Sequence, residues 1–251
     1  MRAVVVRVIA AVCAASWFVL PGFGLVDLSV TWSSDWPQVL EAGWGLFFSV
    51  LVGAPFALVL FRLRGSMPGF PQLAVAIACL AVATVAAEEW RLALLAALAG
   101  IEAVLVGVLA RPFWRWTPAG RSLPVLVVAA AGVVPWVMYA LDMWSRNRQN
   151  RSDGDHSIGV DHYSVQGALA LALALLPVAA GLRRELGPFV PACAGVCGAY
   201  LGLVSIAWPD AAGGIGAVWS ALAIVWGVGL VGVALVRRER TPAASPSPHD
   251  A

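Results

Sequence analysis

The sequence predicts an all-α, polytopic transmembrane helical bundle that forms one domain. Hydrophobic residues make up 61% of the 251 residues and charged residues only 12%, whereas soluble domains are about half apolar and a quarter charged. The apolar residues also lie in continuous runs rather than alternating, which favours helices over the strands of a membrane barrel. We therefore expect the chain in the cell membrane, with the lipid bilayer as its main partner.

Eight apolar stretches have about the 20 residues that a helix needs to cross a bilayer. Their approximate bounds are 4–26, 41–61, 71–88, 91–110, 122–143, 163–182, 188–208 and 214–236. These spans form a transmembrane domain over residues 1–240. The Pro-, Ser- and Ala-rich segment 241–251 is expected to be a disordered cytoplasmic tail.

Arginine placement predicts the orientation, because the cytoplasmic loops of membrane proteins carry an excess of cations. All sixteen cations of this chain are arginine. If the N-terminus is cytoplasmic, twelve of them fall on the cytoplasmic side, and the outer side holds only Arg91, Arg146, Arg148 and Arg151. Eight spans then return the C-terminus to the cytoplasm, and most acids fall at the outer rim.

The first span admits a second interpretation. Basic residues followed by an apolar run also open a secretory signal peptide. However, the run continues to Val26 without a clear small-residue cleavage site, and Val12 before Cys13 does not suit a lipoprotein signal. We therefore favour an uncleaved first helix. Cleavage would leave seven spans with unchanged orientation.

Small residues recur at every fourth position in three spans. They are Gly45, Ser49, Gly53 and Ala57 in the second span, Ala99, Ala103 and Gly107 in the fourth, and Gly198 and Gly202 in the seventh. Helices in lipid associate through close approach of their backbones at such residues. We expect tight packing inside one subunit, and the alternative is a homo-oligomer that forms through these faces.

The fourth span carries one acid deep in its apolar run. Glu102 lies about 11 residues beyond Arg91, which is roughly 16 Å at 1.5 Å per residue and so near the bilayer midplane. An ionised carboxylate is costly there, and we expect a protonated acid that hydrogen-bonds to another helix. Its role is either proton or ion coupling or a structural contact between helices.

The longest polar segment joins the fifth and sixth spans, from Ser145 to His162. Its oxygen and imidazole donors suit zinc, manganese or calcium, so a divalent metal ion is the candidate cofactor. The candidate metal ligands are Asp155, His156, Asp161 and His162. Neither an EF-hand spacing nor an HExxH motif supports this set. Asp161 has a structural alternative, because an acid before a helix caps its free N–H groups.

Polar residues at the outer ends of four spans predict an acidic vestibule. His162 and Gln166 are four residues apart and share one helical face, while Asp142 ends the fifth span, Glu88 the third, and Glu41 begins the second. The candidate ligand- or ion-binding residues are therefore Asp142, Glu88, His162 and Gln166, together with Glu102. The alternative is a set of rim residues that simply face water.

Two motifs in the last two spans do not indicate chemistry. The GxGxxG pattern of residues 227–232 lies inside an apolar span rather than between a strand and a helix, so we expect no nucleotide. Cys193 and Cys197 are one turn apart, and buried cysteines of this kind are typical packing residues. The sequence also lacks a basic tract that would track a nucleic acid.

The segment DHSIGVDHYSVQGALALA, from Asp155 to Ala172, resembles uncharacterised multi-pass membrane proteins of high-GC, actinobacterial-type bacteria. Gly159, Asp161, His162 and Gln166 are its most specific residues. The lysine-free, alanine-rich composition fits such a genome. The resemblance implies membrane location and brings no activity with it.

Three function classes remain. The first is a transporter or channel-like protein that uses the acidic vestibule and Glu102, and the second is a structural or assembly protein without chemistry of its own. The third is a membrane enzyme with an extracytoplasmic His/Asp metal site, which ranks lowest because no nucleophile or metal motif is recognisable. A water-filled path to Glu102 would favour transport, convergence of His156 and His162 with acids would favour the enzyme, and a closed bundle would favour assembly.

Overall fold

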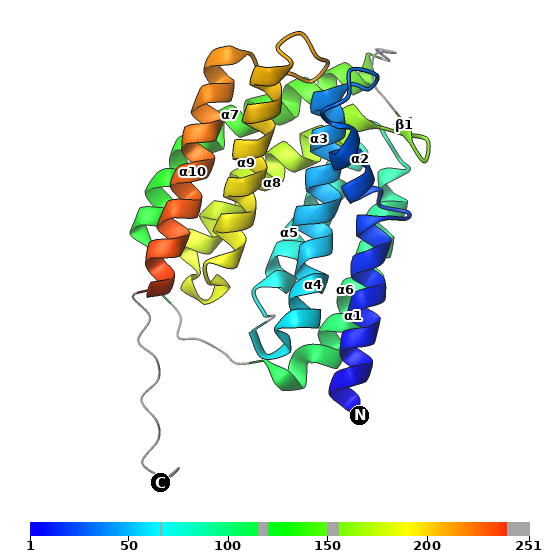
Figure 1. Ribbon diagram of the computed structural model, residues 1–251, viewed down its shortest axis with the longest axis vertical. Coiled ribbons are helices and arrows are strands. Elements are labelled where there is room, and N and C mark those ends of the chain that lie inside the picture. Colours follow the sequence, from blue (N-terminus) through cyan, green and yellow to red (C-terminus); the bar gives the residue numbers. More distant parts are fainter. Residues whose placement is uncertain (66, 115–119, 150–155, 240–251) are drawn as a thin grey trace.

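The computed structural model describes residues 1–65, 67–114, 120–149 and 156–239 (Figure 1). Asp155 and the tail 241–251 lie outside the described residues. Most of the described chain is helical. In chain order its elements are α1 (Arg2–Phe18), α2 (Gly24–Val30), α3 (Gln38–Leu46), the π-helix η1 (Phe47–Gly53), α4 (Ala54–Phe61), the 3-10 turn η2 (Leu63–Gly65), α5 (Gly69–Ala86), α6 (Leu92–Ala110), the 3-10 turn η3 (Arg111–Phe113), α7 (Leu123–Arg148), β1 (His156–Ser157), β2 (Val160–Asp161), α8 (His162–Leu182), the 3-10 turn η4 (Arg184–Leu186), α9 (Phe189–Ala207) and α10 (Ala217–Glu239).

Seven helices in the described part of the chain are long and apolar enough to cross a membrane. They are Gln38–Phe61, Gly69–Ala86, Leu92–Phe113, Leu123–Arg148, His162–Leu182, Phe189–Ala207 and Ala217–Val236. The first of them is α3, η1 and α4 joined end to end. These helices support a multi-pass membrane protein, and they correspond to the second to eighth spans that the sequence predicts.

The first predicted span differs from the structure. Instead of one helix over 4–26, α1 ends at Phe18 and α2 begins at Gly24. The chain turns between them, with Phe23 in the left-handed region at φ 53° and the Gly22 N–H donating to the Ser16 carbonyl at 2.9 Å. Since α1 has only 17 residues, the eighth span stays a prediction. α1 nevertheless packs along α4 and α6 and begins at the end of the bundle where α10 ends (Figure 1).

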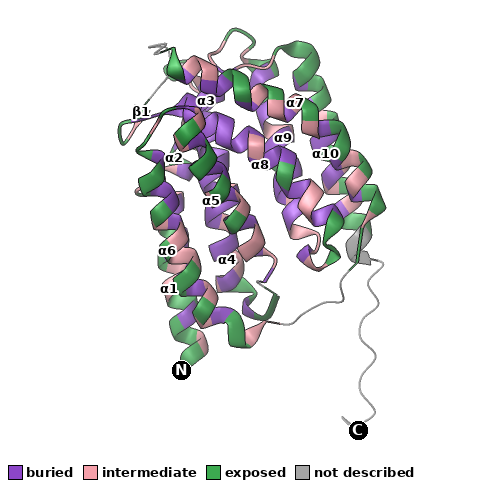
Figure 2. Ribbon diagram, turned by 180° about the vertical axis from the view of Figure 1, so that it is seen from behind, coloured by how far each residue is buried: buried purple, intermediate pink, exposed green. Residues whose placement is uncertain are grey.

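The α3–α4 span and α8 form the centre of the bundle. They are the most buried of the seven long helices, whereas only 28–33% of the apolar stretches that contain α6, α7 and α10 is buried (Figure 2). The exposed residues of α6 are mainly apolar, including Leu94, Ile101 and Val108. Such a face suits contact with lipid tails, as a membrane-spanning helix at the periphery requires.

The small-residue stripe of the second span faces the α1–α2 segment. A Cβ at Gly45 would lie 2.6 Å from Leu28 Cγ, and one at Gly53 would lie 2.6 Å from Phe18 Cε1. The space at both positions therefore fits the hydrogen side chain of glycine but not a Cβ atom. The expected packing within one subunit is confirmed for this stripe, and a homo-oligomer stays a prediction.

The glycines of the last two spans also allow helices to approach closely. A Cβ at Gly198 would lie 2.7 Å from the Trp226 ring, and one at Gly202 would lie 2.5 Å from the Ser220 carbonyl oxygen. Gly227, the first glycine of the GxGxxG pattern, lies against the Gly195 carbonyl. These residues join α9 to α10 by packing.

The middle of the second span is a π-helix of seven residues, η1. A π-helix pairs each N–H with a carbonyl five residues back, so its carbonyls are displaced from their α-helical positions. Gln72 of α5 meets two of them, because its Nε2 donates to the Val50 oxygen at 2.9 Å and to the Leu51 oxygen at 3.3 Å. A side chain of a neighbouring helix thus stabilises the irregular segment.

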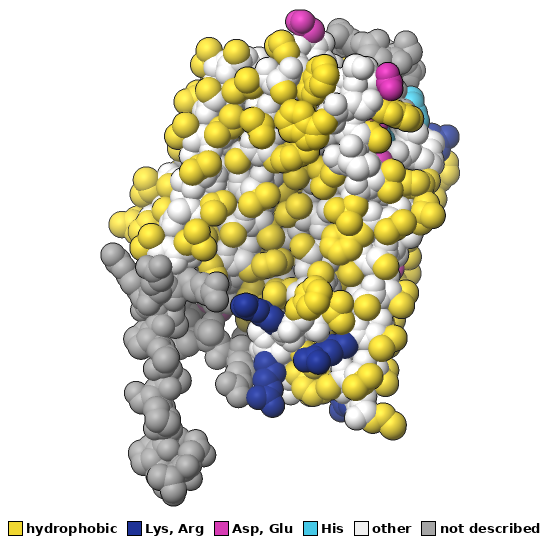
Figure 3. All heavy atoms as spheres, viewed as in Figure 1, with side chains coloured by type: hydrophobic (Ala, Val, Ile, Leu, Met, Phe, Trp, Pro, Cys, Tyr) yellow, Lys and Arg dark blue, Asp and Glu magenta, His cyan; other side chains and the backbone are white. Residues whose placement is uncertain are grey.

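The two ends of the bundle differ in charge. In Figure 3, most of the visible arginine side chains lie at the end where α1 begins, and the visible acids lie toward the opposite end. We name the first the inner end and the second the outer end, following the predicted orientation. The outer end carries the α1–α3 connection, the β1–β2 hairpin and the α9–α10 connection (Figure 1).

Candidate functional site

The candidate site is built around the start of α8 at the outer end. Asp161 precedes this helix, and its Oδ1 accepts a hydrogen bond of 2.9 Å from the Tyr163 N–H. The Ser164 hydroxyl donates to the Asp161 carbonyl at 2.6 Å. An acid at this position satisfies a free N–H group and suits the positive end of the helix. The capping role that the sequence offered for Asp161 is therefore confirmed.

A short β-hairpin, with two residues in each strand and two in its turn, leads into α8. β1 pairs with β2 in antiparallel fashion, with His156 opposite Asp161. The two residues between the strands, Ile158 and Gly159, have φ values of 52° and 78°, and positive φ at both positions is what a type I′ turn requires. The tight turn brings Ser157 back beside the first residue of α8.

His162 is that first residue, and its side chain is 0% exposed. Its Nε2 lies 3.0 Å from Ser157 Oγ, and its Nδ1 lies 3.7 Å from Glu41 Oε1. The imidazole ring stacks on Trp44, with ring centroids 4.6 Å apart and planes inclined by 30°. A hydroxyl, a carboxylate and an aromatic face therefore fix the position of this ring.

Helix α3 supplies the carboxylate and the aromatic ring. Glu41 and Trp44 are three residues apart and so share one face of the helix. The Glu41 side chain is only 3% exposed. Trp44 Nε1 donates to the Gly22 carbonyl at 2.7 Å, so the turn between α1 and α2 is tied to the residue that stacks on His162.

A cavity of about 310 Å³ opens beside this cluster. It is lined by Phe23, Val26, Asp27, Val30, Trp36, Glu41, His156, Ser157 and Ile158. Asp27 and Glu41 are 5% and 2% exposed, so both residues lie below the molecular surface although both line the cavity. The described lining thus combines two carboxylates, one imidazole and one hydroxyl with aromatic side chains. We name this cavity the outer pocket.

Gln166 lies one turn beyond His162 and belongs to a separate hydrogen-bond network. Its Nε2 donates to the Tyr139 hydroxyl at 2.8 Å, and that hydroxyl donates to the Gly213 carbonyl at 2.5 Å. Gln166 Oε1 is buried without a hydrogen-bond partner among the described residues. It points at Gly43 of α3, where a Cβ would overlap it. This network joins α7, α8 and the α9–α10 connection.

The structure does not bring the other two predicted vestibule acids to His162. Asp142 has a side chain 51% exposed and forms an ion pair with Arg146 at 2.9 Å. Glu88 is exposed in the turn that follows α5. The acid that faces His162 is instead Glu41, because α3 passes directly across the start of α8.

The candidate metal ligands divide into separate contacts. His156 Nε2 lies 3.8 Å from Asp161 Oδ2, while His162 faces Ser157 and Glu41. Asp155 lies outside the described residues. Among the residues that are described, no three His, Cys, Asp or Glu side chains are grouped closely enough to hold a metal ion.

Glu102 connects α6 to α1. Its Oε2 accepts a hydrogen bond of 2.5 Å from Trp17 Nε1, and its Oε1 accepts one of 3.3 Å from the Ser16 hydroxyl. The expected hydrogen bond to another helix is present. This arrangement favours the structural role that the sequence left open for Glu102.

A column of aromatic rings separates the outer pocket from Glu102. Trp44 packs on Phe48 with ring centroids 4.8 Å apart, and Phe48 stacks on Trp17 at 5.3 Å. All three side chains are 0% exposed. The column therefore connects His162 at one end to Glu102 at the other through ring contacts and the Trp17–Glu102 hydrogen bond.

No family model, no curated protein and no solved structure matches this chain. The site is interpreted from its own geometry. The resemblance of residues 155–172 to membrane proteins of high-GC bacteria stays a prediction.

Sequence reasoning missed Asp27, Ser157 and Trp36 as pocket residues. By sequence, Asp27 is only one of the acids of the outer rim, because the turn before it lies within an apolar run that is typical of a single helix. Ser157 carries no signal of its own. The one local signal is Gly159, because glycine adopts the positive φ that a tight turn requires, whereas a β-branched residue such as Ile158 is disfavoured there.

Proposed function

We propose that this multi-pass membrane protein binds a small organic cation, of the ammonium type, in the outer pocket. The observation that carries the proposal is the placement of two largely buried carboxylates, Asp27 and Glu41, on one cavity with aromatic walls. Two carboxylates on one cavity give it a negative potential, and apolar surroundings strengthen the attraction of that potential for a cation.

The lining favours an organic ammonium over a bare metal ion. Phe23 and Trp36 line the cavity, and aromatic faces attract ammonium groups. A metal site requires several grouped ligands, and the described residues offer no group of three. A volume of about 310 Å³ is at the lower limit of ordinary ligand pockets and so selects small molecules.

The aromatic column supports a site that is closed toward the bundle centre. Trp44, Phe48 and Trp17 occupy the route that an ion would take from the outer pocket to Glu102. Binding from the outer side is therefore the activity proposed. Transport would require these rings to move apart, and a closed column does not favour an open channel.

Calorimetry on the purified full-length chain in detergent tests the proposal. The probes are tetramethylammonium, ethylammonium, Zn²⁺, Mn²⁺ and Ca²⁺, titrated separately. We expect one ammonium ion to bind per chain. Because hydrogen bonds to charged groups contribute about 1.5–3 kcal/mol, Asp27→Asn and Glu41→Gln should each weaken the binding of ethylammonium, which has N–H donors, about tenfold or more.

Asp142→Asn is the matched control, because it removes an acid at the same end outside the pocket. It should bind the ammonium probe as the wild type does. The proposal is wrong if Asp142→Asn weakens binding as much as Glu41→Gln, or if none of the ammonium probes binds. Binding of a metal ion alone would replace the organic cation with the divalent ion considered from the sequence.

A second candidate function, acyl transfer, is favoured by one specific observation. Ser157, His162 and Glu41 stand in the order nucleophile, base and acid, at 3.0 Å and 3.7 Å, and Ser157 lines the pocket. In this reaction His162 Nε2 takes the Ser157 proton while Oγ bonds to the substrate carbonyl carbon. The imidazole then returns the proton to the leaving group, and water releases the acid from Ser157.

A fluorophosphonate probe separates the two functions. An activated Ser157 becomes labelled, Ser157→Ala abolishes the label, and Ser33→Ala in the neighbouring outer loop leaves it unchanged. Wild-type protein without label would exclude acyl transfer. Ammonium binding should persist in Ser157→Ala, since its two carboxylates remain, so each function can fail while the other stands.

A further inference from the structure

A second cavity lies at the opposite, inner end of the bundle and has the opposite charge. Its volume is about 520 Å³. It is lined by Ala3 and Arg7 of α1, Phe61 of α4, Arg62, Leu63, Arg64 and Gly65 around η2, and Phe113 of η3. Three arginines and no acid are found among these eight residues. We name this cavity the inner pocket.

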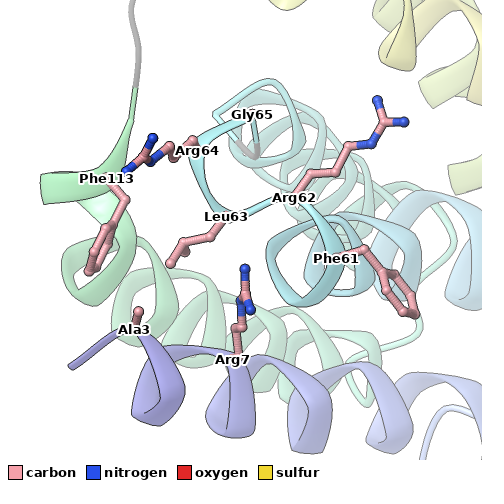
Figure 4. Close-up of a pocket in the computed structure, with 8 residues that line it drawn as sticks. All are labelled: Ala3, Arg7, Phe61, Arg62, Leu63, Arg64, Gly65 and Phe113. Atoms are coloured by element: carbon pink, nitrogen blue, oxygen red, sulfur yellow. The ribbon is translucent and has the colours of Figure 1, made fainter. Parts of the chain in front are cut away.

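The arginines enter the inner pocket from two different segments. In Figure 4, Arg7 projects from α1 toward η2, and Arg64 extends toward Phe113 on one side of the cavity. Arg62 extends to the other side. The positive charge at this cavity therefore comes from two segments rather than from a row on one helix.

These guanidinium groups are not paired within the described protein. Within the described ranges, no carboxylate forms an ion pair with Arg7, Arg62 or Arg64, whereas Arg91 and Arg146 at the outer end each have an acid partner. The three side chains are exposed. Arginine binds phosphate oxygens in bidentate fashion, so unpaired guanidiniums around a cavity suit a phosphate group.

The other walls of the inner pocket are apolar. Leu63 is buried, and Phe61 is 76% exposed on the outside of the bundle. The cavity lies where α4 ends and where α6 passes into η3, which is the level at which spanning helices meet the headgroups. An acyl chain attached to the bound phosphate would find an apolar surface beside it.

We propose that the inner pocket binds the phosphate headgroup of an anionic phospholipid, with Arg7 and Arg64 as the principal ligands. Basic pockets between membrane helices recognise such headgroups. The site is independent of the outer pocket. It also gives these arginines a role beyond the general excess of cations on the cytoplasmic side of a membrane protein.

Native mass spectrometry of the full-length chain tests the proposal by counting bound lipids. The protein in detergent is titrated with phosphatidylglycerol, with phosphatidylcholine, and with inorganic phosphate in separate arms. We expect one phosphatidylglycerol to bind at least tenfold more tightly than phosphatidylcholine. The double variant Arg7→Gln/Arg64→Gln should lose this preference.

Arg121→Gln is the matched control, because it removes the same charge at the inner end outside the cavity. It should keep the wild-type preference within twofold. An equal loss in Arg121→Gln would overturn the proposal in favour of diffuse charge attraction. Inorganic phosphate that binds as tightly as phosphatidylglycerol would overturn the lipid as the source of the phosphate.

The single variants keep the test decisive if the double variant does not fold. Each of Arg7→Gln and Arg64→Gln should weaken phosphatidylglycerol binding severalfold with an unchanged melting temperature. Arg7→Lys retains the charge but not the bidentate geometry, so it should bind with intermediate affinity. Unchanged binding in both single glutamine variants would contradict the proposed ligands.

Discussion

His162 is enclosed by Glu41, Ser157 and Trp44, and this enclosure determines what a substitution there does. A histidine at a solvent-facing rim contributes little packing, and its removal would affect only ligand binding. A fully buried imidazole fills volume between α3 and α8 and also contacts a carboxylate and a hydroxyl. Binding and stability are therefore coupled at this position.

His162→Ala should destabilise the protein by about 2–4 kcal/mol, because it opens a cavity and removes the polar contacts of a buried ring. His156→Ala is the control, since its side chain is 54% exposed and surface changes usually lie within about 0.5 kcal/mol. Unfolding of both variants in detergent, followed by circular dichroism, measures the difference. Equal stability of the two variants would contradict the buried position of His162.

Glu102 offers a second test at the same scale. Glu102→Gln keeps an oxygen that accepts from Trp17 Nε1, so the free energy of unfolding should change little. Glu102→Leu removes the acceptor and leaves the indole N–H unsatisfied, at a cost of about 1–3 kcal/mol. The melting temperatures of the two variants in detergent measure this difference in stability. If Glu102→Leu is as stable as Glu102→Gln, the contact between α1 and α6 does not stabilise the bundle.

The helices show which parts of this structure the sequence predicts. The third predicted span, 71–88, corresponds to Gly69–Ala86 and the sixth, 163–182, to His162–Leu182, because bilayer thickness sets the length of an apolar run. The α1–α2 turn was not predicted, since residues 19–23 are apolar enough to continue a helix. Its local signal is the Pro21–Gly22 pair, a common turn dipeptide, and a Cβ at Gly22 would lie 2.5 Å from the Trp17 carbonyl oxygen.

The candidate site could be predicted from the sequence only in part, because periodicity determines the face of a helix but not how two helices cross. One face of α8 follows from helical periodicity, so His162 and Gln166 could be placed together. Which acid faces them depends on how α3 crosses α8, and that crossing is a tertiary feature without a sequence period. Glu41 was therefore included in the vestibule without being singled out.

Gly53→Leu should destabilise the bundle by about 1–3 kcal/mol, because its Cβ would meet Phe18 at 2.6 Å and force α1 away. Gly100→Leu on α6 is the control, since a Cβ there meets nothing within 4 Å. We expect the control to melt at or above the wild-type temperature, because leucine favours a helix more than glycine does. A melting temperature of Gly53→Leu equal to that of the control would mean that this face is loosely packed.

On the scale of the whole molecule, the two pockets lie at opposite ends and carry opposite charges. Arg7 and Arg64 line the inner pocket, and Asp27 and Glu41 line the outer one. This asymmetry agrees with the arginine bias from which the orientation was predicted. A cation from outside and an anionic headgroup from the cytoplasmic leaflet would each meet the pocket of complementary charge.

Labelling of single cysteines in intact cells tests that orientation. All four native cysteines are buried, and the experiment uses a background in which they are replaced by alanine. Ser34→Cys at the outer end should react with an impermeant maleimide. Gly65→Cys at the inner end should react only after the cells are opened. The reverse pattern would show that the chain is inserted the other way.

The π-helix η1 sets the phase between the two halves of the second span. In an α-helix, positions four apart advance by about 40° beyond a full turn, so a stripe at every fourth residue winds around the helix. A π-helix rotates less per residue than an α-helix, so η1 reduces this winding of the stripe. As a result, Gly45 and Gly53 both face the α1–α2 segment. If the same residues of η1 rewound to regular α-helical pairing, the residue that the wider turns absorb would rotate α4 by about 100° relative to α3. Phe61 would then leave the inner pocket while Glu41 stayed in the outer one, so the π-helix keeps the two pockets in register.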